Sequence, residues 1–179
     1  IRPINLVFEG LMASQNLLHD FLTNIERLGR KPCYFYKEDG TWKTLSWTEA
    51  GEEVCRIALG LKALGLKKGD RVGIFSGNRM EWTLCDLATL SLGGITVPVY
   101  HSSPADQATY ILKNSGARFV FVSTNPFCEK IRGTECIEKI ILFEGTGPAG
   151  TITLAQLKQE GFKGDPKSWV ESIRQIKPT

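Results

Sequence analysis

Three clusters of polar residues follow three predicted strands and precede three predicted helices. The clusters are Ser76–Asn78, Tyr100–Ser103 and Ser123–Asn125. In open α/β sheets, ligands collect beyond the carboxyl ends of the strands, and the free N–H groups at the start of a helix can receive an anion. The sequence therefore predicts a ligand-binding face that carries Asn78, Tyr100, His101 and Ser102. The alternative is that the Ser and Asn side chains only cap the helices that follow them.

Two further side chains have the chemistry of a general acid or base. His101 is followed directly by Ser102, but neighbours in sequence rarely form a nucleophile–base pair. Asp86 lies within a predicted apolar helix, where we expect a partly exposed position or a hydrogen bond to a neighbouring loop. The chain contains no G-x-G-x-x-G after a strand, no G-x-x-x-x-G-K-[ST] and no G-x-S-x-G. We therefore assign no catalytic residue from these patterns.

The cysteines do not form a pattern that binds metal. There are five of them, at Cys33, Cys55, Cys85, Cys128 and Cys136. No C-x-x-C pair is present, and a zinc site needs ligands in closer pairs. We expect free thiols, mostly buried as small apolar side chains in a reducing compartment. The cysteine pattern thus predicts no metal site and a cytoplasmic location.

The candidate ligand face depends on a sheet that positions it. Four apolar stretches are predicted to be strands: Arg71–Ser76, Ile95–Tyr100, Arg118–Ser123 and Ile137–Phe143. The first three begin about 24 residues apart, with helical patterns between them, which predicts an α/β fold with a mainly parallel sheet. Such strands are buried on both faces under helices. Pro98 cannot donate to the ladder, so we place it near a strand end or at an edge of the sheet.

A helix, a hairpin and a second helix are predicted before this sheet. Apolar residues recur at helical spacing over residues 17–28. Tyr34–Leu45 predicts a small β-hairpin around Asp39-Gly40, separate from the centre of the main sheet.

Three helix starts have recognisable capping residues. Ser14 or Asn16 would cap the first helix. Ser46 and Glu49 form a capping box for the second helix. Ser103, followed by a proline, is predicted to cap the helix that contains Asp106 in its first turn.

Composition excludes some classes of protein. The chain has 179 residues, 42% of them apolar and 23% charged, with a formal net charge of +3. This is ordinary for a globular domain, and no basic run is dense enough to predict nucleic-acid binding. No apolar run is long enough for a membrane span. The four tryptophans are expected to lie in the core or in interfaces; they are Trp42, Trp47, Trp82 and Trp169.

Several short motifs occur in a fixed order between residues 46 and 121. They are S-W-T-E at Ser46–Glu49, A-x-G-L-x-x-L-G at Ala58–Gly65, K-G-D-R-V at Lys68–Val72, N-R-x-E-W at Asn78–Trp82, G-G-I-x-V-P-x-Y at Gly93–Tyr100 and Y-I-L-x-x-S-G-A-x-x-x-F at Tyr110–Phe121. In this order they resemble the N-terminal part of AMP-forming acyl-CoA synthetases, within the adenylate-forming superfamily. The long-chain fatty acyl-CoA branch is the most similar, and the resemblance covers most of residues 14–179.

The resemblance implies a fold and a reaction. Residues 14–179 would be the first α/β subdomain of the adenylate-forming enzyme fold, and residues 1–13 an N-terminal extension. The implied enzyme joins a fatty acid to CoA with MgATP through an acyl-adenylate. The phosphate-binding loop, the glutamate that helps to hold Mg²⁺ and the lysine of the C-terminal lid would lie beyond Thr179. We therefore expect no catalytic residue and no metal ligand in this chain, and no activity from it alone.

The resemblance also implies partners. Basic residues after the third strand contact the 3′-phosphate of CoA in some relatives, and here the candidates are Lys130 and Arg132; the alternative is that both are solvated surface charges. Fatty acid, ATP and CoA are the implied small-molecule partners, with no nucleic acid. The resemblance is compatible with peripheral membrane association and with a homo-oligomer. The competing hypothesis is a stand-alone α/β domain that binds a small molecule or a partner without catalysis.

Overall fold

The structure is a computed structural model that describes residues 16–176. Its elements are α1 (Leu17–Leu28), β1 (Pro32–Glu38), β2 (Thr41–Ser46), α2 (Trp47–Ala63), β3 (Arg71–Phe75), α3 (Met80–Ser91), β4 (Ile95–Val99), α4 (Ala105–Ser115), β5 (Phe119–Val122), α5 (Asn125–Ile131), β6 (Lys139–Leu142), β7 (Ile152–Thr153), α6 (Leu154–Gly161) and α7 (Pro166–Arg174). The predicted extension at residues 1–13 lies outside the described residues.

The described residues form an α/β fold with one parallel sheet and one separate hairpin. The sheet has five strands in the order β4-β3-β5-β6-β7, and all of its neighbouring strands are parallel. The four predicted strands are confirmed as β3, β4, β5 and β6, each slightly shorter than expected. The fifth strand, β7, has only two residues and leaves no periodic signal in the sequence. The hairpin β1–β2 is also confirmed, and both turn residues, Asp39 and Gly40, have positive φ.

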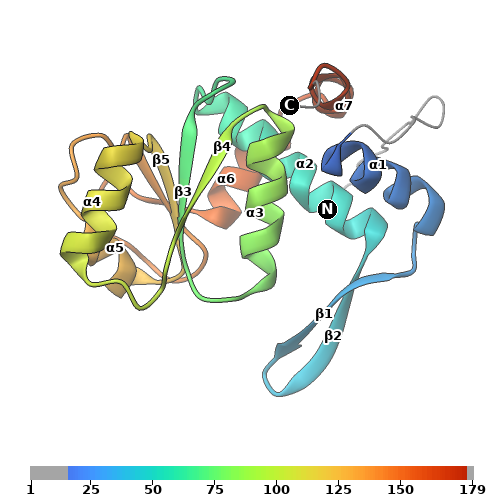
Figure 1. The fold of residues 1–179 in the computed structure, drawn as a ribbon. Helices are drawn as coiled ribbons and strands as arrows, with labels where there is room; N and C mark the ends of the chain where they lie inside the picture. Colours follow the sequence, from blue (N-terminus) through green and yellow to red (C-terminus); the bar gives the residue numbers. More distant parts are fainter. Residues whose placement is uncertain (1–15, 177–179) are drawn as a thin grey trace.

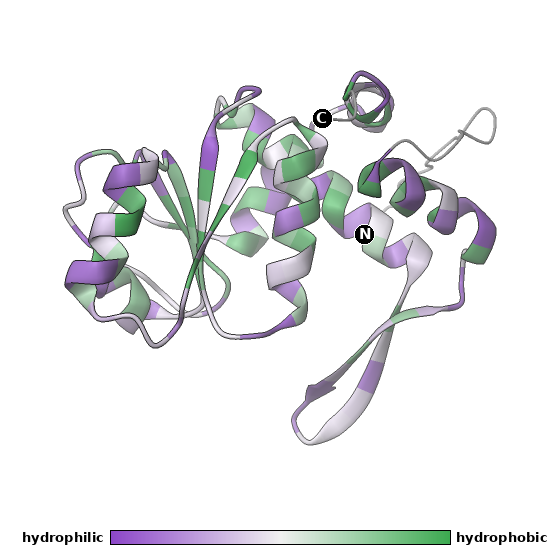
Figure 2. Cartoon of the chain, viewed as in Figure 1, coloured by the Kyte–Doolittle hydropathy of each residue, from purple (hydrophilic) through white to green (hydrophobic). Residues whose placement is uncertain are grey.

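Helices cover both faces of the sheet, as predicted. Alternate strand residues contribute to two apolar clusters, so that Val72 and Ile74 lie in the larger cluster and Phe75 in the smaller one. The larger cluster also holds residues of α1, α2, α3, α6 and α7, whereas the smaller one holds residues of α4 and α5. Figure 1 shows α4 and α5 on one side of the sheet and the other helices on the opposite side. The central strand residues are mostly hydrophobic in Figure 2, as expected for strands buried between two layers.

One strand departs from the prediction of burial on both faces. β4 is an edge strand of the sheet, and its residues Ile95 and Pro98 are exposed, whereas Val99 is buried. The expectation for Pro98 is confirmed, because an edge strand needs no second hydrogen-bonded neighbour. The expectation of burial is wrong for β4, because within residues 16–176 only β3 pairs with it.

The sequence analysis missed two helices near the end of the described chain. α6 and α7 pack on the α2–α3 side of the sheet. The indole Nε1 of Trp169, in α7, donates a hydrogen bond of 2.8 Å to Ser91 Oγ at the end of α3. Trp169 has no exposed surface, so the prediction of a core position is confirmed for this tryptophan. The helices are short, at eight and nine residues, and a short helix depends on packing more than on its own propensity.

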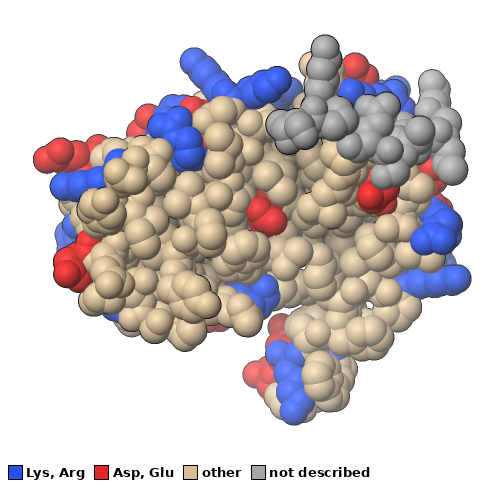
Figure 3. Space-filling view, viewed as in Figure 1, with Lys and Arg blue, Asp and Glu red and all other residues tan. Residues whose placement is uncertain are grey.

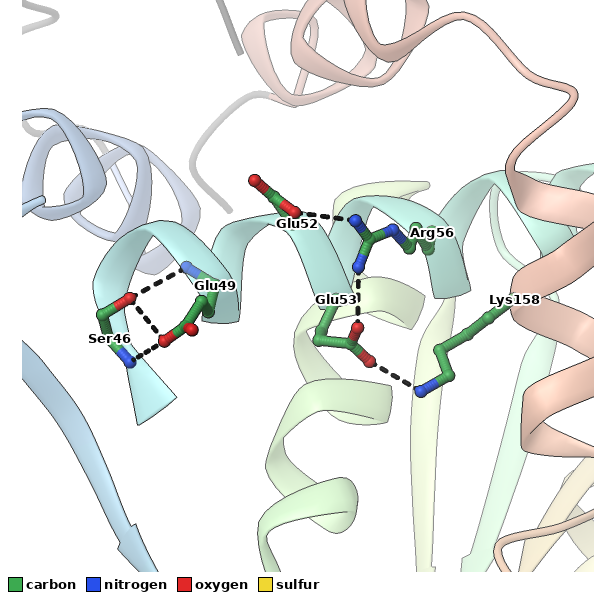
Figure 4. Close-up of polar contacts among 6 residues, drawn as sticks. All are labelled: Ser46, Glu49, Glu52, Glu53, Arg56 and Lys158. Carbon is green, nitrogen blue, oxygen red and sulfur yellow. Dashed lines mark hydrogen bonds and ion pairs between the residues drawn. The ribbon is translucent and has the colours of Figure 1, made fainter. Parts of the chain in front are cut away.

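The predicted helix caps are partly confirmed. Asn16 caps α1, since its side chain accepts hydrogen bonds from the backbone N–H groups of Leu18 and His19. The capping box at α2 is confirmed: Glu49 N donates to Ser46 Oγ at 3.2 Å, and Ser46 N donates to Glu49 Oε2 at 2.8 Å (Figure 4). An unpredicted second box, Thr153 with Gln156, starts α6.

Two glycines let α2 and α6 cross with their backbones in close approach. A Cβ atom added to Gly161 of α6 would lie 1.9 Å from the backbone oxygen of Arg56 in α2. A Cβ atom added to Gly60 of α2 would lie 2.3 Å from the backbone oxygen of Leu157 in α6. Each helix therefore requires a residue without a side chain under the backbone of the other.

We predict that Gly161→Ala destabilises the chain by about 2 kcal/mol or more, because the new methyl group meets backbone that cannot move aside locally. The free energy of unfolding in urea measures this effect. Gly77→Ala is the matched control, since an added Cβ there has no neighbour within 4 Å, and we expect a change within about 0.5 kcal/mol. Equal stability of the two variants would show that the helices do not cross as closely as described.

The capping box of α2 should make stability depend on pH. Hydrogen bonds from the Ser46 backbone and side chain lower the pKa of Glu49. Because this pKa is lower in the folded state, the stabilisation is present above the ordinary glutamate pKa and is lost as pH falls through the lowered value. We predict that Glu49→Gln narrows the difference in unfolding free energy between about pH 7 and about pH 3. Thr153→Ala is the control, because the Thr153–Gln156 box has no ionisable group, and its effect should be the same at both pH values. A Glu49→Gln profile parallel to that of the parent chain would contradict the prediction.

Candidate functional site

The sheet brings the three predicted polar clusters to one edge. β3 lies between β4 and β5, and all three strands are parallel. Their carboxyl ends therefore lie side by side, followed by Ser76–Asn78, Tyr100–Ser103 and Ser123–Asn125. We call this region the carboxyl edge. The carboxyl edge lies at the carboxyl ends of parallel strands, and open α/β sheets bind their ligands there.

The helices that start at the carboxyl edge have no side-chain caps. The N-cap residues of α3, α4 and α5 are Arg79, Pro104 and Thr124, and none of them makes a side-chain cap hydrogen bond. The prediction that Ser103 caps α4 is wrong, because the helix begins one residue later and the Ser103 backbone N–H instead closes a turn with the carbonyl of Tyr100 at 2.9 Å. The polar clusters are therefore not explained by capping. The backbone N–H groups at the start of α3 and α4 thus donate no hydrogen bond to an N-cap side chain, which leaves donors of the kind that an anion site requires.

The residues predicted for the ligand face are exposed, and the serines beside them are buried. Asn78, His101 and Ser102 are exposed, and Tyr100 keeps 78% of its surface accessible. The rings of Tyr100 and His101 are stacked, with centroids 6.5 Å apart. Within residues 16–176, the His101 ring takes part in no hydrogen bond to a serine, so the structure contains no Ser–His pair at this edge. The face offers an aromatic platform and amide and hydroxyl groups, but no activated nucleophile.

Lys130 reaches the carboxyl edge from α5. Its Nζ donates a hydrogen bond of 3.0 Å to the carbonyl oxygen of Ser103, and it lies 5.4 Å and 5.7 Å from the ring centroids of Phe127 and Phe75. The ammonium group is therefore held beside the loop after β4 by a carbonyl and two aromatic faces. No pattern in the sequence predicts this contact, because it joins residues 27 positions apart.

Arg132 lies elsewhere. It is the C-cap residue of α5, its side chain keeps 65% of its surface exposed, and its Nη1 lies 3.4 Å from Glu129 Oε2. It lines a cavity of about 210 Å³ together with Thr134 and Lys139, at the start of β6. Lys130 does not line this cavity. The two predicted CoA-phosphate residues are therefore not brought to one pocket.

A larger cleft lies between the hairpin and the start of α3. It measures about 720 Å³ and is lined by hairpin residues, by Asn78 and Arg79, and by Glu81 and Glu144. Arg79 donates to both carboxylate oxygens of Glu81, at 2.9 and 3.0 Å, and to Glu144 at 3.1 Å. This arginine ties the loop after β6 to the loop after β3.

The Arg79 contacts also control ionisation in the cleft. Burial is the largest single effect and acts to raise the pKa of Glu81. The hydrogen bonds from Arg79 and from the Glu81 backbone N–H, with the charges of Arg79 and Lys158, together outweigh burial and lower this pKa. The Glu81 carboxylate is therefore held as an anion beside Arg79. Sequence analysis missed these roles, although Arg79 and Glu81 both lie in the N-R-x-E-W motif.

The remaining candidates have no chemical role in the described structure. Asp86 is partly exposed, as predicted. The pKa of Tyr34 is raised to about 12, first by burial and then by the charges of Cys33 and Asp86. All five cysteines are free thiols, as predicted. Burial raises the pKa of Cys55 to about 12 and that of Cys85 well above its ordinary value. These two thiols are protonated and inert at neutral pH.

Comparison with known proteins places this architecture in a family. Residues 21–178 match the family model described as AMP-binding enzyme. The chain is 32% identical over 145 residues to the long-chain-fatty-acid–CoA ligase FadD15 of Mycobacterium tuberculosis, an alignment that covers 79% of this chain and 24% of that protein. It is 28% identical to the long-chain-fatty-acid–CoA ligase ACSBG2 of Rattus norvegicus, over 62% of this chain and 17% of that protein. The chain thus spans about a quarter or less of these relatives.

Solved structures show the same fold. The acetoacetyl-CoA synthetase of Streptomyces lividans superposes with a TM-score of 0.73 at 18% identity, over 79% of this chain and 24% of that one. The anthranilate CoA ligase AuaEII, solved with anthranoyl-AMP, superposes with a TM-score of 0.72 at 21% identity, over 79% of this chain and 27% of that one. The resemblance in motifs, the match to the family model and the shared fold agree, and the chain belongs to the family of AMP-binding, adenylate-forming enzymes.

Proposed function

We propose that the chain forms the N-terminal α/β part of an ATP-dependent, AMP-forming fatty acyl-CoA synthetase. The observation that carries this proposal is the match to long-chain-fatty-acid–CoA ligases at 32% identity over most of the chain. In the proposed reaction, the fatty acid carboxylate attacks the α-phosphate of MgATP, which forms an acyl-adenylate and releases pyrophosphate. The thiolate of CoA then attacks the acyl carbon and displaces AMP.

The role proposed for this chain is to build a wall of the active site. The carboxyl edge supports this role, because exposed Asn78, Tyr100 and Ser102 lie beside helix starts without side-chain caps. Among residues 16–176 there is no group of three His, Cys, Asp or Glu side chains placed to hold a metal ion. We therefore assign no residue of the described chain to Mg²⁺ and no catalytic step to it.

The surface around β4 supports the proposal of a neighbouring subdomain. Exposed residues on β4, after it and on α4 are Ile95, Pro98, Tyr100 and Tyr110. Figure 3 shows few charged side chains on the face over α3, β4 and α4: one acidic side chain lies over α3, and the others gather around the rim of this face. Exposed apolar and aromatic side chains on a surface with few charges support an interaction site here. We assign it to the second subdomain of the proposed enzyme.

CoA is the proposed ligand of the basic residues at the end of α5. Lys130 lies at the carboxyl edge, and Arg132 is exposed with only a long contact to Glu129. An arginine with a free edge can bond two phosphate oxygens at once. We propose that Arg132 meets the 3′-phosphate of CoA and that Lys130 mainly holds the loop after β4.

The cellular setting of the proposed enzyme follows from the same reasoning. Five free thiols are in keeping with a reducing compartment, and we propose the cytoplasm. Within residues 16–176 the structure has no helix of the length and hydropathy that crossing a bilayer demands. Peripheral contact with membranes, where fatty acids partition, is part of the proposal.

Arg132→Ala tests the CoA contact in the longer enzyme that carries synthetase activity. We expect the KM for CoA to rise about tenfold through loss of a charge-assisted hydrogen bond, and the KM for ATP to stay unchanged. Arg27→Ala is the control, because Arg27 is also exposed and donates only to Asn24 in its own helix. If Arg132→Ala leaves the KM for CoA at the parent value, Arg132 is a solvated surface charge.

ATP–pyrophosphate exchange tests the reaction itself. With carboxylates from acetate to stearate, we expect no exchange above a no-enzyme control from protein whose mass confirms 179 residues, and exchange from a longer chain that continues into a phosphate-binding loop. Exchange by the short chain would contradict the proposed division of roles, and His101 and Asp86 would then be the first residues to mutate. An inactive longer chain, with tight ligand binding by the short one, would favour the alternative of a stand-alone binding domain.

A further inference from the structure

One face of the hairpin is largely exposed, although its residues Phe35, Lys37 and Trp42 also line the open cleft between the hairpin and the start of α3. The ladder pairs Phe35 with Thr44 and Lys37 with Trp42, and paired residues of a ladder lie on the same face of the ribbon. Phe35 and Trp42 each keep 67% of their surface accessible. The Lys37 ammonium lies 5.4 Å from the centre of the Trp42 ring. We call this set, Phe35, Lys37, Trp42 and Thr44, the ribbon face.

The opposite face of the hairpin anchors it to the domain. Tyr34 and Leu45 are partners in the ladder, and both pack against the larger apolar cluster at the base of the ribbon. The rest of the ribbon extends away from the body of the molecule in Figure 1 and stands clear of it in Figure 3. A two-stranded ribbon is marginally stable in water by itself. Two exposed aromatic rings on its free face therefore indicate an interaction surface.

The charges along the ribbon are arranged so that it complements itself. Lys31 lies at the base and Asp39 at the tip, and both are exposed. Of the ion pairs within residues 16–176, none includes Lys31 or Asp39. When two such ribbons pack in antiparallel directions about a two-fold axis, the tip of each lies over the base of the other. Asp39 of each copy then meets Lys31 of its mate, as an isologous interface requires.

We propose that the ribbon face is the contact between two copies of this chain. The rings of Phe35 and Trp42 in one copy pack against the same rings in the other, and Lys31–Asp39 pairs close both ends. Four partly exposed aromatic side chains, at roughly 150–250 Å² each, bury less than the roughly 1,200 Å² of a standard stable interface. The dimer is therefore weak and reversible, and it forms as concentration rises.

Sedimentation velocity over a range of concentrations tests the proposal with the chain of 179 residues. We expect the parent chain to form a dimer, and Phe35→Ser and Trp42→Ser each to raise its dissociation constant at least about tenfold. Tyr110→Ser is the matched control, since Tyr110 on α4 is also an exposed aromatic, with 68% of its surface accessible; it should leave the dissociation constant unchanged. Far-UV circular dichroism melts confirm that each variant is folded.

A charge experiment tests the antiparallel direction. Lys31→Glu places like charges together at both ends, and we expect the dissociation constant to rise about fivefold. Adding Asp39→Asn to Lys31→Glu removes the repulsion and should recover most of the loss, because asparagine tolerates the positive φ of 49° at residue 39. A chain that stays monomeric at every concentration would overturn the proposal. A dimer whose dissociation constant is unchanged by Phe35→Ser and Trp42→Ser would also overturn it. So would a dimer that is disrupted only by Tyr110→Ser, because the contact would then lie on the face of α4 and β4.

Discussion

The close crossing of α2 and α6 is the constraint on which one half of the fold depends. α2 contacts α1, α3, α6 and α7, so it is the common partner of the helices on that face of the sheet. Gly60 and Gly161 let the two backbones approach without side chains between them. If α6 moved away, the apolar cluster that includes Leu157 and Trp169 would open to water. Two residues without side chains therefore fix the position of a whole helical layer.

The crossing of α2 and α6 also accounts for the burial of one charged side chain. Arg56, in α2, is almost fully buried, and a buried cation is destabilising unless it is paired. Its guanidinium donates to Glu52 at 2.7 Å and to Glu53 at 2.8 Å, while Lys158 of α6 donates to Glu53 at 2.8 Å. Figure 4 shows Glu53 between the two cations, which links the helices beside the point where Gly161 meets Arg56. The close approach brings the charges together, and the charges in turn favour one register of α6 on α2.

The other half of the molecule, around α4 and α5, leaves part of the sheet and its loops exposed. The small layer of α4 and α5 leaves the β4 edge and the loops after β3, β4 and β5 uncovered. Lys130 braces the loop after β4, and Arg79 braces the loop after β3 against Glu144. These contacts hold the backbone of the carboxyl edge while Asn78 and Tyr100 stay exposed. Loops that are held by such contacts and carry exposed polar and aromatic groups are consistent with the proposed role as one wall of a larger active site.

Local patterns in the sequence were sufficient to predict the elements that depend on interactions between near neighbours. The β3–β6 strands follow from continuous apolar runs, the hairpin from Asp39-Gly40 and the start of α2 from Ser46 and Glu49, because each involves residues only a few positions apart. The order of motifs was sufficient to indicate the family, which the match over residues 21–178 confirms. The gathering of the three polar clusters at one edge was also predictable, since parallel strands end at the same edge of a sheet.

Only the tertiary structure decided which elements are neighbours. The order β4-β3-β5 makes β4 an edge strand, although its apolar sequence is typical of a buried strand. α7 is held by Trp169 and Ser91, which are 78 residues apart, although its start carries local signals, Asp165 at the N-cap and Pro166 in the first turn, that the sequence analysis did not use. Lys130 and Arg132 are two positions apart in sequence, yet one contacts Ser103 and the other lines a separate cavity. The physical reason is the same in each case: long-range packing and hydrogen bonds set these positions, and a sequence pattern records only the preferences of near neighbours.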